Sequence, residues 1–108
     1  RLNPSPDYWL LRDLGLCYLL KGQYEKALNE SKKALQLSPK APPVYFQLAV
    51  TYSLLDLQEE ATVSAAKCVE LAPFVSVDWF LKIARFKNQS DLQLIVDAMR
   101  KAGFPEGS

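Results

Sequence analysis

The chain repeats itself with a period of 34 residues. The stretch YLLKGQYEKALNESKKALQLSP at residues 18–39 returns as YSLLDLQEEATVSAAKCVELAP at residues 52–73. At this offset small residues fall on small ones, aromatic residues on aromatic ones and proline on proline: Gly15 on Ala49, Tyr18 on Tyr52, Ala27 on Ala61, Ala34 on Cys68 and Pro39 on Pro73. Such a period is typical of a helical hairpin stacked along a solenoid. The repeat therefore predicts an all-α fold, a right-handed α-solenoid of antiparallel helix pairs with about three repeats.

Start and stop signals divide the chain into helices. Gly22, Asp56 and Ser90 are 34 residues apart, and each is followed three residues later by Glu or Gln. This pattern favours a capping box at the start of the second helix of each pair. Proline and glycine mark the helix ends at Pro39, Pro73 and Gly103. The signals predict six helices, at about 6–20, 23–37, 42–54, 57–71, 77–87 and 91–102.

The residues that align at the 34-residue offset match a known pattern, W-x2-L-G-x2-Y followed by A-x3-F and P. The first repeat reads Leu11-x2-Leu14-Gly15-x2-Tyr18, Ala27-x3-Ser31, Pro39. The second reads Tyr45-x2-Leu48-Ala49-x2-Tyr52, Ala61-x3-Ala65, Pro73. The chain therefore resembles the tetratricopeptide repeat family over residues 8–75. In the third repeat two registers stay open, one with Trp79 and Phe86 on the pattern and one with Phe80, Ile83 and Ala84.

Two further likenesses bear on the domain organisation. The end of the chain, DLQLIVDAMRKAGFPE, is similar to the closing helix of tetratricopeptide segments that follow the catalytic domain in some bacterial class III adenylate cyclases. Leu2–Pro4 matches Leu37–Pro39 and Leu71–Pro73. We expect a single domain over 1–108 with repeats at about 8–41, 42–75 and 76–108, the third degenerate. Residues 1–4 would be the tail of an earlier repeat in a longer protein.

Little in the composition favours catalysis. The chain has no histidine, which removes Ser-His and Cys-His nucleophile pairs and the commonest metal ligand. Its four glycines are isolated, and its net charge of +1 is unlike that of a nucleic-acid binder. Cys17 and Cys68 favour small buried side chains in a reducing compartment, with a disulfide as the alternative. We expect a cytoplasmic, non-catalytic protein without a cofactor or metal, and without nucleic-acid or membrane partners.

The resemblance also implies a binding surface. In the family, the second, fifth, ninth and twelfth positions of the first helix of each repeat line a concave groove. The residues at these positions here are mostly apolar and aromatic, and those expected to line the groove are Trp9, Arg12, Leu16, Leu19, Phe46, Val50 and Phe80. Chaperone-binding members use a lysine, arginine and asparagine clamp, which Leu16 does not fit. The alternative is that Trp9 and Phe46 pack together in a tight superhelix. A second candidate surface, for an acidic partner, is Lys82, Arg85 and Lys87, which could equally be a solvated face.

These observations predict a protein–protein interaction module. Its apolar concave groove would hold a peptide or a helix, or would mediate self-association. The alternative is a regulatory or dimerising C-terminal region of a bacterial signalling enzyme such as an adenylate cyclase.

Overall fold

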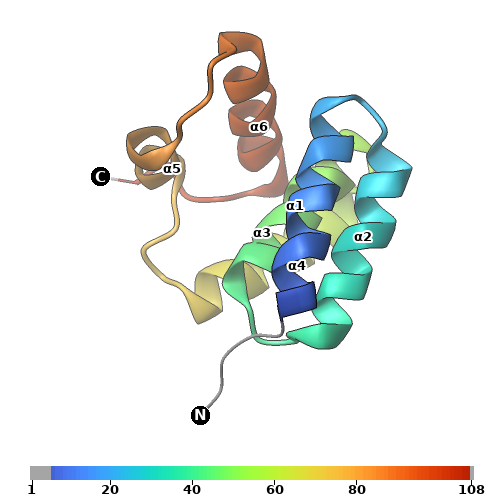
Figure 1. Cartoon of the computed structure of the whole chain (residues 1–108). Coiled ribbons are helices and arrows are strands. Elements are labelled where there is room, and N and C mark those ends of the chain that lie inside the picture. The colour runs from blue at the N-terminus through green and yellow to red at the C-terminus, as the bar shows by residue number, and fades with distance from the viewer. Residues whose placement is uncertain (1–5, 108) are drawn as a thin grey trace.

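A computed structural model shows six helices over the described part of the chain (Figure 1). They are α1 (Pro6–Leu20), α2 (Tyr24–Leu37), α3 (Pro42–Leu54), α4 (Gln58–Leu71), α5 (Val77–Ile83) and α6 (Gln89–Ala102). The structure describes residues 6–107, and the side chains of these residues other than 6–10 and 12. This range contains no strand, and the predicted all-α fold of antiparallel helix pairs is confirmed.

The first two hairpins form a row in which α1 packs against α2, α2 against α3, and α3 against α4. Small residues stand where the helices meet, since Ala27 and Ala61 are both 0% exposed. A Cβ added at Gly15 would lie only 2.2 Å from Nε2 of Gln47. That Nε2 donates a 2.8 Å hydrogen bond to Oγ of Ser31 inside the α2–α3 contact. The glycine at this position therefore leaves room for a buried polar link between neighbouring hairpins.

The turn inside each of these hairpins differs from the predicted capping box. Gly22 and Asp56 are not N-caps; both have a left-handed backbone, with φ of 80° and 61°. The amide of Gln23 donates to the carbonyl of Tyr18, and that of Leu57 donates to Tyr52, each at 2.9 Å. These bonds close the ends of α1 and α3 in the Schellman pattern. The repeated signal at residues 22 and 56 thus terminates the first helix, because a left-handed residue suits a helix end.

The third helix pair departs from the prediction at its connection. A helix was predicted over 77–87, but α5 ends at Ile83 and Ala84 is extended, with ψ of 139°. Ser90 is not the N-cap of α6, because Oδ1 of Asn88 accepts the amide of Ser90 at 2.8 Å. The shorter α5 lets Phe86 pack its ring 6.0 Å from that of Phe80. Tertiary packing of an aromatic side chain here outweighs the local helical pattern.

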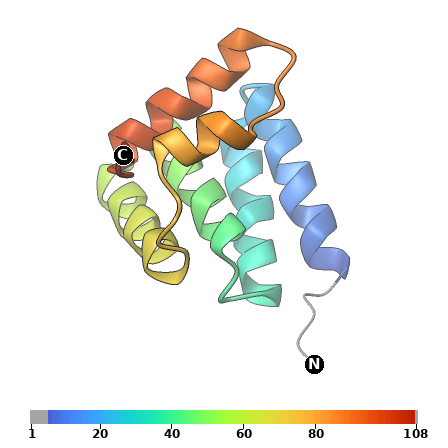
Figure 2. The same ribbon diagram turned by 90° about the vertical axis from the view of Figure 1, so that its left-hand side faces the viewer.

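Helix α6 does not extend the row of α1 to α4. It crosses over α3 and α4 and packs against both, as Figure 2 shows. The chain after α6 returns to the start of α5, where the amides of Val77 and Asp78 donate to the carbonyls of Pro105 and Glu106 at 2.9 Å. The radius of gyration is 12.8 Å, close to the value of about 13 Å for a compact domain of this length. The third pair therefore folds back onto the second hairpin.

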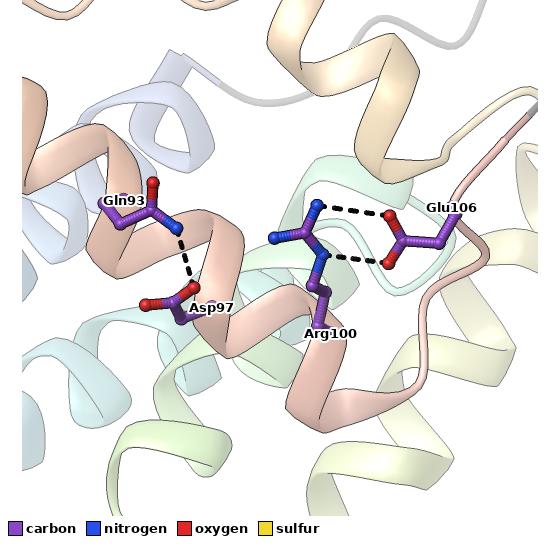
Figure 3. Close-up of polar contacts among 4 residues, drawn as sticks. All are labelled: Gln93, Asp97, Arg100 and Glu106. Atoms are coloured by element: carbon purple, nitrogen blue, oxygen red, sulfur yellow. Dashed lines mark hydrogen bonds and ion pairs between the residues drawn. The ribbon is translucent and has the colours of Figure 1, made fainter.

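Polar contacts hold α6 and the following segment in this position. Lys101 forms an ion pair with Asp56, and Nε2 of Gln58 donates to the carbonyl of Lys101 at 2.8 Å. Arg100 donates two hydrogen bonds to the Glu106 carboxylate, at 2.9 and 3.2 Å (Figure 3). This carboxylate also raises the pKa of Arg100. The end of α6 is thus joined both to the α3–α4 turn and to the chain segment beside α5.

Candidate partner-binding cleft

An apolar cleft of about 410 Å³ opens between α1, α3, α5 and the connection from α5 to α6. Pro43 and Phe46 of α3 and Leu16 of α1 form one side. Ile83 and Phe86 form the other side, and Ile95 of α6 lies among the lining residues. The cleft exists because α5 and α6 fold back over α3 and leave the space beside α1 uncovered. Its volume falls within the range of about 300–1,000 Å³ that is usual for ligand pockets.

The structure brings together five of the residues predicted for the groove. Leu16, Leu19, Phe46, Val50 and Phe80 all line the cleft. Their exposure differs: Leu19 and Val50 are each 1% exposed, and Phe80 is 8% exposed, so these three form the floor. Leu16 is exposed and Phe46 is half-buried, so these two offer surface to a partner. Trp9 and Arg12 lie on α1, but their side chains are outside the described part of the chain.

A series of aromatic rings in tilted and edge-to-face contact lines the cleft. The ring of Phe46 lies 5.4 Å from Phe80 and 5.5 Å from Phe104. Phe80 in turn meets Phe86 nearly edge to face, with the ring planes at 70°. Ring pairs at such distances add about 0.5–1.5 kcal/mol each beyond the area they bury. Aromatic contacts therefore join Phe46 of α3 to Phe80 of α5, and through Phe80 to Phe86 in the connection after α5.

Two exposed apolar residues of the cleft were not among the residues predicted for the groove. Phe74 is 63% exposed and Ile83 is 49% exposed, and both line the opening. Phe74 packs edge to face on Trp79, with ring centroids 5.3 Å apart. At the 34-residue offset Phe74 corresponds to Lys40, so the repeat gave no sign of an apolar residue there. The only available signal was the density of apolar residues in PFVSVDWF at residues 73–80.

The polar groups around the cleft are few, and Asp13 is the one acidic residue among those that line it. The amide of Gln47 is already bonded to Ser31. The thiol of Cys68 donates to the carbonyl of Pro42 at 3.5 Å, and burial raises its pKa to about 11, so it is protonated at neutral pH. Cys17 and Cys68 are both free cysteines, the first exposed and the second buried. Over the described residues, no group of three or more His, Cys, Asp or Glu is placed to hold a metal ion. The arrangement is suited to binding apolar side chains.

The second predicted surface is not one helix face. Lys82 lies on α5 and pairs with Asp78 at 3.1 Å. Arg85 lies in the connection, where its guanidinium donates to the carbonyls of Ile83 and Ala84 at 3.4 and 3.2 Å. Lys87 is exposed in the same connection. Two of the three cations already have partners within the protein, which makes this patch a weaker candidate than the cleft.

Comparison with known families gives matches in the first four helices. A family model described as TPR repeat matches residues 15–56, and one described as tetratricopeptide repeat matches residues 42–74. Together they span residues 15–74, more than half of the 108 residues, and neither reaches α5 or α6. The comparison with curated proteins gives no match. None of the helices within residues 6–107 has the length and apolar character needed to span a bilayer.

Proposed function

Because the chain belongs to the tetratricopeptide repeat family, whose repeats generally mediate protein–protein interactions, we propose that the apolar cleft binds a protein partner. It encloses one or a few large apolar side chains of a partner peptide or helix. The observation that carries this proposal is the exposure of Phe74 and Ile83 at the opening of a pocket with apolar walls. Large apolar side chains held exposed at a concave site are typical of interaction surfaces.

The surroundings of the cleft favour a peptide chain over a small polar ligand. Gln47 is engaged inside the protein, and the Cys68 thiol is occupied by Pro42. Binding energy would come mainly from apolar burial, at roughly 25 cal/mol per Å² of apolar surface removed from water. An amphipathic helix or an extended peptide can supply several apolar side chains at once. The module has no need of catalytic groups for this role, in keeping with the typically non-catalytic character of tetratricopeptide domains.

The test is a selection of displayed random peptides of about twelve residues on the whole chain. We expect the selected peptides to be rich in leucine, isoleucine and aromatic residues. Binding of these peptides should be abolished by Ile83→Asp, which places a charge at the cleft opening. The matched control is Leu81→Asp on the same helix, because Leu81 is 46% exposed and does not line the cleft.

Leu81→Asp should leave peptide binding at the wild-type level, and both variants should keep the wild-type helix content. Equal binding of the peptides to wild type and Ile83→Asp would contradict the proposal. Loss of binding in Leu81→Asp with retention in Ile83→Asp would move the binding surface to the outer side of α5.

The second function expected from the sequence is a regulatory or dimerising region of a bacterial signalling enzyme such as an adenylate cyclase. It rests on the likeness of residues 91–106 alone, and no feature of the cleft favours it. Self-association through the cleft is compatible with the proposal, since a second copy can also supply apolar side chains. Sedimentation of wild type and Ile83→Asp separates that case, because only a cleft-dependent oligomer dissociates in the variant.

A further inference from the structure

A second, open hollow of about 650 Å³ lies beside the first half of α4 and shares no lining residue with the cleft. Tyr52 of α3 lines it, and α4 contributes the carboxylates of Glu59 and Glu60 and the side chain of Val63. Tyr52 is half-buried, whereas Val63 is 69% exposed. An aromatic ring, two carboxylates and an exposed apolar side chain thus lie together on a surface that we term the α4 hollow.

The internal repeat shows what covers the corresponding tyrosine of the first hairpin. At the 34-residue offset Tyr52 corresponds to Tyr18, and Glu60 corresponds to Lys26. The ammonium nitrogen of Lys26 lies 5.7 Å from the centre of the Tyr18 ring, within the distance of roughly 6 Å that is usual for a cation–π contact. Among the side chains that the structure describes, no cation lies over the Tyr52 ring. The second hairpin therefore keeps the aromatic ring but has a carboxylate where the first has a cation.

The start of the helix does not by itself explain this difference. Glu59 and Glu60 both lie in the first turn of α4, where a negative charge interacts favourably with the helix dipole. Helix α2 has Glu25 in its first turn for the same reason, yet its next residue is Lys26. The charge at residue 60 is thus a separate feature of the second hairpin.

The electrostatic surroundings of the α4 hollow favour a positive charge. Burial raises the pKa of Tyr52, and the negative charge of Glu60 raises it further. Neither Glu59 nor Glu60 forms an ion pair with the side chains that the structure describes. The ammonium group of Lys101, on the neighbouring α6, is already paired with Asp56. The hollow thus places carboxylates beside an aromatic ring, and both groups attract a cation.

We propose that the α4 hollow is a docking site for an arginine or lysine side chain of a partner protein. The cation lies against the Tyr52 ring and pairs with Glu60, as the Lys26 cation lies over Tyr18 in the first hairpin. Val63 favours a polypeptide over a free polyamine, because its exposed side chain can pack against an apolar residue next to the cation. The site is separate from the cleft, so it does not depend on the function proposed for the cleft.

The probe for the test is the dipeptide N-acetyl-arginyl-leucine amide, titrated into the isotope-labelled whole chain and followed by amide NMR. We expect the largest shifts at Glu60 and Val63. The same dipeptide with citrulline, which has the shape of arginine without its charge, should bind roughly three- to tenfold more weakly. Glu60→Lys should abolish the shifts, because it places a cation over Tyr52 as Lys26 does over Tyr18.

The matched pair of variants is Glu60→Gln and Glu25→Gln, which remove the same charge from the starts of α4 and α2. Glu60→Gln should weaken binding of the arginine dipeptide, and Glu25→Gln should leave it unchanged, with wild-type helix content in both. Ile83→Asp should also leave it unchanged, so the α4 hollow and the cleft are tested separately.

Equal weakening in Glu60→Gln and Glu25→Gln would overturn the proposal, because it would reflect overall charge alone. Equal binding of the arginine and citrulline dipeptides would also overturn it. Tighter binding of spermidine than of the arginine dipeptide at the same amides would overturn the assignment to a partner protein and assign the hollow to a free polyamine.

Discussion

Several small residues of this protein lie where neighbouring helices meet. Gly15, Ala27 and Ala61 could be singled out from the sequence, because the 34-residue repeat aligns small residues with small ones. The structure explains them by the approach of neighbouring helices, with no solvent reaching Ala27 or Ala61. What the sequence could not show is the polar link between Gln47 and Ser31 beside Gly15, because it depends on the distance between two hairpins.

Ala27→Leu and Ala61→Leu should each lower the free energy of unfolding by about 1–3 kcal/mol, because a larger side chain overpacks the helix contact. Chemical denaturation followed by circular dichroism measures the change. Ala66→Leu on α4 is the matched control for Ala61→Leu, since Ala66 is exposed. An unfolding curve of Ala61→Leu identical to that of Ala66→Leu would show that the helix contact is elsewhere.

Phe46 belongs both to the cleft and to the core. Its ring contacts Phe80 and Phe104, so Phe46→Ala should lower the free energy of unfolding by about 2–4 kcal/mol, somewhat less than for a fully buried aromatic residue. The sequence alone left two roles open for Phe46, lining the binding groove or packing against Trp9. Calorimetry gives the melting temperature of Phe46→Ala, and Ile83→Ala serves as the comparison because Ile83 lines the cleft but is exposed. A lower melting temperature for Phe46→Ala alone would show that Phe46 also stabilises the fold. Equal melting temperatures for both variants and wild type would contradict the packing described here.

At the scale of helices, the sequence predicted the first four well. The predicted bounds of α1 and α3 are those observed, and α2 and α4 each begin one residue later than predicted. Three features were predicted wrongly: the capping residues, the end of α5 and the start of α6, which begins at Gln89 and not near residue 91. Gly22 and Asp56 fit an N-cap by residue type, but their left-handed backbone and hydrogen bonds close the preceding helix. α5 ends at Ile83, and the residues after it make contacts that the sequence pattern does not show: Phe86 packs on Phe80, and Arg85 donates to the carbonyls of Ile83 and Ala84.

The ion pair between Asp56 and Lys101 joins α6 to the α3–α4 turn. The hydrogen bond and charge of Lys101 lower the pKa of the Asp56 carboxyl below its usual value of 3.8. A lowered folded-state pKa means that the contribution to stability is present above about pH 4, the unfolded-state pKa, and is lost as the pH falls through the folded-state pKa. Asp56→Asn, which keeps a residue tolerant of positive φ, should flatten the decline of the free energy of unfolding below about pH 4.

Urea unfolding at a series of pH values measures this effect, at low salt, where exposed ion pairs are least screened. Lys101→Met should give the same flattening, because it removes the other partner of the pair. Wild type and Asp56→Asn with parallel pH dependences would contradict the role of this pair.

The segment after α6 holds α5 in place through two backbone hydrogen bonds, from Val77 and Asp78 to residues 105 and 106. Deleting residues 105–108 should therefore speed amide hydrogen exchange at Val77 and Asp78, because those amides lose their acceptors. Exchange in α3 should stay as in the full chain. Unchanged exchange at Val77 and Asp78 would show that this segment does not secure the cleft wall.

For the whole molecule, the arrangement of the third helix pair decides where a partner can bind. The repeat predicted that α5 and α6 continue the row, which would leave an open concave groove. Instead α6 lies across α3 and α4. Val50 and Leu19 are buried, and the exposed lining residues of the cleft include Leu16, Phe74 and Ile83. This placement could not be read from the sequence, because it depends on long-range contacts such as Phe46 with Phe104. The apolar and aromatic character of the surface could be predicted from the sequence.

The central claim, that the cleft receives apolar side chains of a protein partner, has a direct test in methyl NMR. The chain has two isoleucines, Ile83 and Ile95, which both line the cleft, and one methionine, Met99, which is 0% exposed and does not line it. Titration of the labelled chain with a selected peptide should shift the methyl signals of Ile83 and Ile95 and leave Met99 in place. A bound peptide that leaves both isoleucine signals unmoved would contradict the claim.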